Sequence, residues 1–312
     1  VNLKRQSVSG KYDGVCLICD EVSDASNRLQ SAFQGPLLDN KFGRVHVPRL
    51  VTVGIFNPPQ ITTTGGKLAI AVVNRVVMLF DFRTPYTDWI NGLCSGFRAP
   101  NVPKLPKGWQ KRIRYHASIL RSYLNQNEAV RDSSDDEILN RNEPWKPIHT
   151  RRSWTNAVIL MAAAEAAGAD ERVVDVLVAG CVGEKVSQDF FEWKSRMDLG
   201  DPAEYLHPDW HSNEGHFKED RGDVVATTVG MVATHYLANK TKSNYVNLMK
   251  FFRRTAELNF EGIAVSEMLH SQLTLKHNRP KGMDFSEAAA ALTPIVEFLH
   301  ESTLMERILP KD

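Results

Sequence analysis

The sequence predicts a mainly α protein of two helical lobes, with a strand-containing N-terminal region. Two patterns and the composition predict this class. Apolar residues recur at helical spacing from about residue 109 onward, while β-branched strand-like runs fall within the first third of the chain. The composition, 42% hydrophobic and 24% charged, is that of a globular protein. We divide the chain into a basic N-terminal part with strands and first helices (1–127), a helical middle continuing the N-terminal lobe (128–220) and a helical C-terminal lobe (221–312).

The N-terminal part contains three strand-like runs. Two are short apolar runs, at 14–22 and 49–56. The third, "KLAIAVVNRVVMLFDF" at 67–82, predicts one long strand or a pair of strands after a turn at Gly65-Gly66. Prolines then predict a loop over 99–108.

The first predicted helix covers 109–126. Its apolar stripe consists of Ile113, Ala117, Leu120 and Leu124, which recur every three or four residues. The basic residues of this helix would then lie away from the stripe and be available to a ligand.

The later helices are predicted from their periodicity and end signals. We expect them at 153–167 (ending at Gly168), 171–179 (between Asp170 and Gly180), 184–198, 222–239, 243–258, 261–277 and 285–307. Ser243 and Asp284 are predicted caps, Ser134 or Asp135 caps a short helix in the acidic connection 131–147, and Pro294 is expected to kink or interrupt the last helix. The segment 199–220 is predicted to be a gap between two helical groups.

The four cysteines predict buried free thiols rather than a zinc or redox site. Cys16 and Cys19 form a CxxC inside a strand-like run, whereas a redox CxxC opens a helix. A zinc site needs about four ligands, and Cys94 and Cys181 stand alone. Free thiols are typical of a reducing compartment.

The charge is distributed unevenly along a chain whose net charge is only +1. Residues 1–39 carry a net charge of −1, residues 40–127 carry +11, and residues 128–312 carry −9. Such asymmetry points to a nucleic-acid partner. The alternative is a solvated basic face, or one half of a contact with the acidic part of the chain.

The stretch 89–127 contains no acidic residue and mixes cations with Trp109 and Tyr115. Cations neutralise phosphates, and aromatic rings can stack on unpaired bases. Further cations lie at the start of the helix expected at 153–167 and on the helix expected at 243–258. Together these clusters predict an RNA-binding groove. Its candidate residues are Lys104, Lys107, Lys111, Arg112, Arg114, Arg121, Arg151, Arg152, Lys250, Arg253 and Arg254.

The segment "HPDWHSNEGH" at 207–216 raises the possibility of a metal site. His207, His211 and His216 could bind a metal, with Glu214 as a general base. Pro208 and the residues after His211 argue against the continuous helix of a zinc protease, so we favour a structural or interfacial loop.

Other enzyme classes lack their motifs. The chain contains no GxSxG, GxGxxG or GxxxxGK[ST] sequence, so we expect no catalytic residue and no cofactor. No apolar stretch reaches the length of a membrane span, and the polar start lacks the apolar core of a secretory leader. The chain begins at Val1 rather than Met, which suggests that a preceding segment was removed.

The strand-bearing N-terminal part, the two helical lobes and the basic patches in both halves together resemble a nucleoprotein of negative-strand RNA viruses. The resemblance is architectural and covers the chain without a diagnostic motif. It implies that the protein coats single-stranded RNA, clamps it between the lobes and assembles with its own copies through terminal arms. Residues 1–13 and "MERILPKD" would be such arms.

The resemblance further implies a viral polymerase or phosphoprotein as a partner, no membrane insertion, and location in the virion and the host cytoplasm or nucleus. Two alternatives from other classes remain open. One is a viral capsid or coat protein. The other is a metal-dependent hydrolase that uses the His207–His216 cluster.

Overall fold

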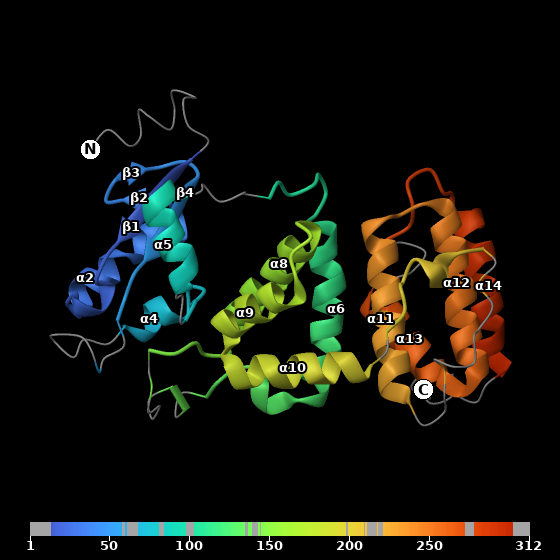
Figure 1. Cartoon of the computed structure of the whole chain (residues 1–312). Helices are drawn as coiled ribbons and strands as arrows, with labels where there is room; N and C mark the ends of the chain where they lie inside the picture. Colours follow the sequence, from blue (N-terminus) through green and yellow to red (C-terminus); the bar gives the residue numbers. More distant parts are fainter. Residues whose placement is uncertain are drawn as a thin grey trace. The chain divides into compact units, whose positions relative to one another are not determined.

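A computed structural model gives the structure of the chain, and Figure 1 shows its helices and strands. Contacts divide the chain into two compact units, each described by itself. Unit 1 comprises Val1–Leu105 and Glu128–Asp189, and unit 2 comprises Pro106–Asn127 and Phe190–Asp312. The described residues are 14–57, 60, 68–80, 84–97, 103–134, 137–138, 143, 145–197, 199–208, 210, 217, 221–271 and 278–301.

The structure is mainly α with strands near the N-terminus, as the sequence predicts. In unit 1, β1 (Val15–Cys19) and β4 (Leu50–Gly54) lie where strands are expected and pair in parallel. Strands β2 (Lys41–Phe42) and β3 (Val45–His46) form a short antiparallel hairpin whose turn contains Gly43 at φ +55°. The segment between β1 and β2 contains η1 (Val22–Asp24), α2 (Asn27–Ala32) and α3 (Gln34–Asp39).

The strand or strand pair predicted over 67–82 is wrong. Within the described part of this run, Ile70–Val73 forms the single helical turn α4, which buries Val72 and Val73. A side chain and a helix carbonyl satisfy the neighbouring backbone instead of a strand ladder. The Ala69 amide donates to the buried Gln30 side chain (2.7 Å), and the Met78 amide donates to the Gly180 carbonyl (2.9 Å). The predicted turn at Gly65-Gly66 lies outside the described residues.

The four cysteines are free, but only Cys181 is buried. Cys16 and Cys94 are exposed and Cys19 is half-buried, so the prediction of uniformly buried thiols is wrong. Cys16 and Cys19 do lie on a strand. Because neighbouring strand residues point to opposite faces, their odd spacing places the two thiols on opposite sides of β1.

The helices of unit 1 include one that the sequence did not predict, α5 (Tyr86–Ser95). Helix α8 (Arg151–Ala166) packs against α9 (Glu171–Val182), with Gly168 at φ +72° in the turn between them. The Asp170 side chain caps α9 by accepting the Arg172 amide at 2.9 Å, as predicted. Helix α9 runs past Gly180 to Val182, three residues beyond the predicted end at 179. Helix α10 (Glu184–Arg196) follows after Gly183, and its residues from Phe190 onward belong to unit 2.

The second segment of unit 1 begins with a short stretch of local structure. The 3-10 helix η2 (Glu128–Val130) follows α6 (Lys111–Gln126). Ser134 and Glu137 exchange the two hydrogen bonds of a capping box, at 2.9 and 3.2 Å, which supports Ser134 as the predicted cap. Asp135 lies outside the described residues.

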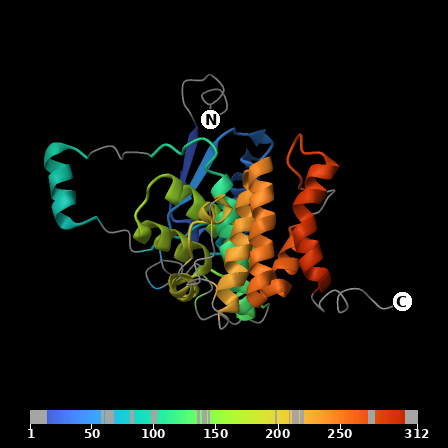
Figure 2. The ribbon, with the colours of Figure 1, turned by 90° about the vertical axis from the view of Figure 1, so that its right-hand side faces the viewer.

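Unit 2 is a bundle of helices around one core. Helix α6 (Lys111–Gln126) packs on α11 (Gly222–Ala238), which also contacts α13 (Glu261–His270), while α12 (Lys242–Thr255) packs on α14 (Phe285–Glu301). A π-helical turn, η4 (Ala256–Phe260), breaks α12 from α13 with Asn259 at φ +67°. Figure 2 shows the long helices of this unit, in orange and red, running along one another. The core includes Val225, Val229, Tyr236, Tyr245, Leu248, Phe251 and Phe252, all fully buried.

Helix α6 forms where predicted, but its apolar stripe is misplaced. The buried side chains are His116, Ile119, Leu120 and Tyr123, whereas Ala117 is exposed. Contacts also group α6 with the C-terminal helices. The three segments predicted from the sequence instead place this helix in the N-terminal part, 1–127.

Of the caps predicted for the C-terminal helices, Ser243 is wrong and Asp284 is confirmed. The cap of α12 is Thr241, which accepts the Asn244 amide at 3.1 Å, and not Ser243. Asp284 accepts the Glu287 amide at 2.7 Å and caps α14, as predicted. Helix α14 continues through Pro294, so this proline does not end it.

Candidate nucleic-acid interface

Helix α6 starts in an electropositive segment. Its N-cap, Gln110, makes no capping hydrogen bond through its side chain, and no acidic residue lies in the first turn. Lys111 and Arg112 occupy that turn, and exposed Lys104 and Lys107 precede it. A helix N-terminus already carries a partial positive charge, so cations there are unfavourable unless an anion lies nearby. This end of α6 is therefore suited to bind a phosphate.

Two cations of α6 also contact the C-terminal end of α11. Lys111 Nζ lies 3.1 Å from Asn239 Oδ1, and Arg114 Nη1 donates to the Leu237 carbonyl at 2.9 Å. The carbonyls at a helix C-terminus carry partial negative charge, so these contacts are favourable. Lys111 and Arg114 thus have a structural role in unit 2, although both are exposed.

Arg121 is half-buried, and its guanidinium already has an acidic partner within the fold, which makes it a weaker RNA candidate than its neighbours on α6. Its Nη2 contacts Glu267 Oε2, and the Glu267 side chain is only 5% exposed. The Ser271 hydroxyl also donates to this carboxylate. Arg121 is the counter-ion of a buried acid and is removed from the candidate RNA contacts.

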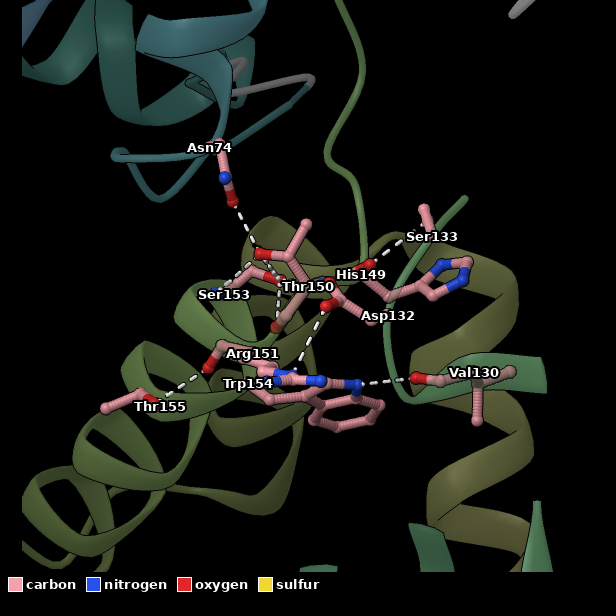
Figure 3. Close-up of polar contacts among 10 residues, drawn as sticks. All are labelled: Asn74, Val130, Asp132, Ser133, His149, Thr150, Arg151, Ser153, Trp154 and Thr155. Carbon is pink, nitrogen blue, oxygen red and sulfur yellow. Dashed lines mark hydrogen bonds and ion pairs between the residues drawn. The ribbon is translucent and has the colours of Figure 1, made fainter. Parts of the chain in front are cut away.

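Helix α8 supplies the corresponding cations of unit 1. Arg151 and Arg152 occupy its first turn, which contains no acidic residue. Figure 3 shows the surrounding contacts. The Thr150 side chain accepts the Ser153 amide at 3.2 Å, and Ser153 Oγ accepts the Thr150 amide at 2.7 Å, so the backbone is capped by hydroxyls without negative charge. Arg151 is 90% exposed and its Nε lies 3.3 Å from an Asp132 carboxylate oxygen.

The segment before α8 is held by four further hydrogen bonds. Trp154 Nε1 donates to the Val130 carbonyl at 2.8 Å, and the Ser133 amide and hydroxyl both donate to the His149 carbonyl at 3.0 Å. The Thr150 hydroxyl donates to Asn74 Oδ1 at 2.6 Å. The first turn of α8 is therefore a rigid base for its two exposed arginines.

Arg75 is a cation that the sequence analysis missed. It follows Asn74 directly, and its guanidinium donates to the Ala71 carbonyl. Partial burial and the nearby positive charge of Arg152 lower its pKa. Because Arg75 lies inside a run predicted to be a strand, no signal in the sequence places it near α8.

Two arginines at the end of α12 share an acidic partner in the π-helical turn that follows, η4. Arg253 Nε lies 3.0 Å from Glu257 Oε1, and Arg254 Nη1 lies 3.2 Å from Glu257 Oε2. Both arginines are in the last turn of α12, where positive charge is favourable. Lys250 is exposed on the same helix. Ion pairing and the helix end account for Arg253 and Arg254 at least as well as RNA contact does.

The first turn of α12 shows how an acid can match a cation at a helix start. Lys242 lies there, and its Nζ contacts both Glu287 carboxylate oxygens, at 2.8 and 2.9 Å. This bonding lowers the pKa of Glu287. The first turn of α12, like those of α6 and α8, contains no acid of its own, but its cation Lys242 is matched by Glu287 of α14. At α8 Asp132 contacts Arg151 and the charge of Arg152 remains, which makes the starts of α6 and α8 the stronger candidates for phosphate.

The aromatic residues proposed to stack bases are only partly available. Trp109 and Tyr115 are half-buried, and the Tyr115 ring meets the His116 ring edge to face at 5.1 Å. The predicted groove would combine cations from both units. That RNA-binding groove therefore stays a prediction.

The histidine-rich segment is anchored by aromatic residues. Tyr205 and Phe217 are buried, and both pack with Trp210 against Phe251 of α12. Of the predicted metal ligands only His207 is described. His211, His216 and Glu214 lie outside the described residues. Among the residues that are described, no three His, Cys, Asp or Glu side chains gather as a metal site.

Comparisons with known proteins do not identify a family for this chain. No protein-family model, curated protein or solved structure matches the chain. In the part of the chain that the structure describes, no helix has the length and apolar character needed to cross a bilayer.

Proposed function

We propose that this protein binds single-stranded RNA without sequence preference and assembles with its own copies, as a viral nucleoprotein does. The observation that carries the proposal is the first turn of α6 and of α8, where two cations occupy a helix N-terminus without an acid in the turn. Phosphate supplies the missing negative charge at these positive helix ends. Such contacts bind any sequence, because the phosphate carries no base identity.

The cations that support the RNA proposal most are exposed ones that hold no acid of the fold. Lys104 and Lys107 precede α6 and are exposed, and Arg152 is exposed on α8. Arg121, Arg253 and Arg254 hold acids of the fold and contribute less to the proposal. We therefore centre the proposed RNA contacts on the starts of α6 and α8, with Arg75 as an added member beside Arg152.

RNA affinity tests the proposal. Purified protein is titrated into a short fluorescent single-stranded RNA at several salt concentrations. Lys104→Gln with Lys107→Gln, and separately Arg151→Gln with Arg152→Gln, should weaken binding to all RNA sequences alike. Each pair should reduce the slope of log affinity against log salt by about 1.4, since each of the two lost phosphate contacts on a single strand contributes about 0.7.

The matched control is Arg172→Gln with Lys185→Gln. It removes the same charge from exposed positions on α9 and α10, outside the proposed contacts. If the control pair weakens binding as much as the two test pairs, the effect is one of net charge and the proposed contacts are wrong. If wild-type protein does not bind RNA at low salt, the RNA proposal itself fails.

Particle shape tests the assembly part of the proposal against a capsid protein. Negative-stain microscopy of protein with RNA should show rings or filaments. Closed shells would favour the capsid alternative.

A further inference from the structure

The two-stranded sheet of unit 1 has an uncovered apolar face. The parallel register sets Cys16 beside Val51 and Ile18 beside Val53, and these four side chains share one face. Ile18 is 64% exposed and Val51 61% exposed. On the opposite face Leu50 is buried. Parallel strands normally have both faces covered, usually by helices, and within the described residues no such layer covers this face.

Helix α5, teal in Figure 2, is a helix whose apolar side is exposed. It is ten residues long, and none of them is buried. Tyr86, Trp89, Ile90 and Leu93 recur at helical spacing on one side, and Tyr86 is 72% exposed. Its acidic residue, Asp88, lies on the other side. An amphipathic helix with no buried residue is a helix without its packing partner.

We propose that α5 of one copy of this chain packs on the exposed β1–β4 face of a second copy. One chain carries a sheet face that lacks a helix and a helix that lacks a core, and in the single molecule both stay exposed. The residues of the two surfaces are uncharged, so their contact buries no charge. The contact is head-to-tail and leaves one α5 and one sheet face free at the two ends, so it can repeat along a chain of subunits.

This inference rests on the self-assembly half of the proposed function and names the surfaces that would carry it. It does not depend on RNA, because neither surface includes a proposed RNA contact.

Two native thiols make the contact testable. Cys16 lies on the exposed sheet face, and Cys94 lies beside the apolar stripe of α5, four residues after Ile90. Cys181 should not react at pH 7, because burial raises the pKa of its thiol to about 12. RNA-free Cys94→Ser protein, which keeps Cys16, is mixed with Cys16→Ser protein, which keeps Cys94. A short bismaleimide is then added and the products are separated on a denaturing gel.

The mixture should give a cross-linked dimer that neither variant gives alone, because only the mixture brings Cys16 of one copy to Cys94 of another. The double variant Cys16→Ser with Cys94→Ser measures the background from Cys19. A mixture with no more dimer than the separate variants overturns the proposal. A wild-type product linked only within one chain also overturns it, since α5 would then cover its own sheet.

A second pair of variants tests α5 directly in the mixture. Trp89→Ser with Leu93→Gln should reduce the dimer to background, while Thr87→Ala with Asn91→Gln on the polar side should leave it unchanged. Circular dichroism should match wild type in both, because α5 buries no residue. A cross-link that survives the apolar substitutions overturns the contact. RNA affinity measured on the same proteins separates the two proposals: cross-linking without RNA binding would remove the RNA function and leave this contact.

Discussion

Cations that look alike in the sequence meet different surroundings in the structure. Arg114 donates to the end of α11 and Arg121 neutralises a buried carboxylate, whereas Lys107 on the approach to the same helix is exposed. The difference arises from tertiary neighbours more than a hundred residues away in sequence, which periodicity cannot reveal. The role of each arginine is therefore assigned from the acid or carbonyl that its side chain contacts.

Arg121→Met should lower the free energy of unfolding by about 3 kcal/mol, because it leaves the Glu267 carboxylate buried without its counter-ion. Urea denaturation measures the change. The double variant Arg121→Met with Glu267→Met should recover most of the loss, since two apolar side chains can replace a buried pair. A single variant as stable as wild type would return Arg121 to the candidate RNA contacts.

The cap of α8 is a second residue whose role follows from its contacts. Thr150→Ala removes the acceptor of the Ser153 amide and the donor to Asn74, so it should destabilise unit 1 by about 1–2 kcal/mol. Thermal unfolding measures this loss. Thr155→Ala is the control, because Thr155 only donates to a carbonyl of its own helix on the surface. Equal effects of the two substitutions would contradict the cap.

At the scale of elements, the sequence predicts long helices well and short apolar segments poorly. The helices α6, α8, α9, α11 and α14 begin within a few residues of their predicted starts, because capping residues and amphipathic spacing are local signals. The run that contains α4 was mistaken for a strand, since four apolar residues cannot distinguish a strand from a buried helical turn. Of the candidate site, the two helix starts could be predicted, but Arg75 and the partner of Arg121 could not.

Two glycines in helices should respond oppositely to alanine. At Gly180 in α9 an added Cβ would lie 2.3 Å from the Met78 carbonyl oxygen, whereas nothing lies within 4 Å of a Cβ at Gly262 in α13. Gly262→Ala should therefore stabilise the protein by about 0.5–1 kcal/mol through helix propensity alone. Gly180→Ala should destabilise it, because the Met78 backbone must move and its hydrogen bond to the Gly180 carbonyl is strained. Chemical denaturation of the two variants checks the opposite signs, and stabilisation by both would contradict the close approach.

At the scale of the whole molecule, the main finding is that the compact units are interleaved in sequence. Helix α6 packs with α11 in unit 2, although the residues between them include α8 and α9 of unit 1. Charge along the chain suggested a basic front part and an acidic rear part, but contacts join part of the first to the second. Charge runs report on surfaces and partners, whereas the division into units follows the buried faces of the helices.

Ile119→Ala should show this division. Ile119 is buried on α6 at 1% exposure, so the substitution should destabilise unit 2 by about 2–4 kcal/mol. Hydrogen–deuterium exchange should then speed up in α11 and α12 while α8 keeps its protection. Equal loss of protection in α8 would mean that the two units unfold together.

The interleaving has a consequence for the newborn protein. As the chain leaves the ribosome, α6 emerges well before α11, the helix that covers its buried side. During that interval α6 lacks this covering helix, while the ribosome makes the second segment of unit 1, Glu128–Asp189. Partly made chains of this kind expose apolar surface that invites aggregation. The cations that crowd α6 would then keep the waiting helix soluble by mutual repulsion, before any RNA is bound.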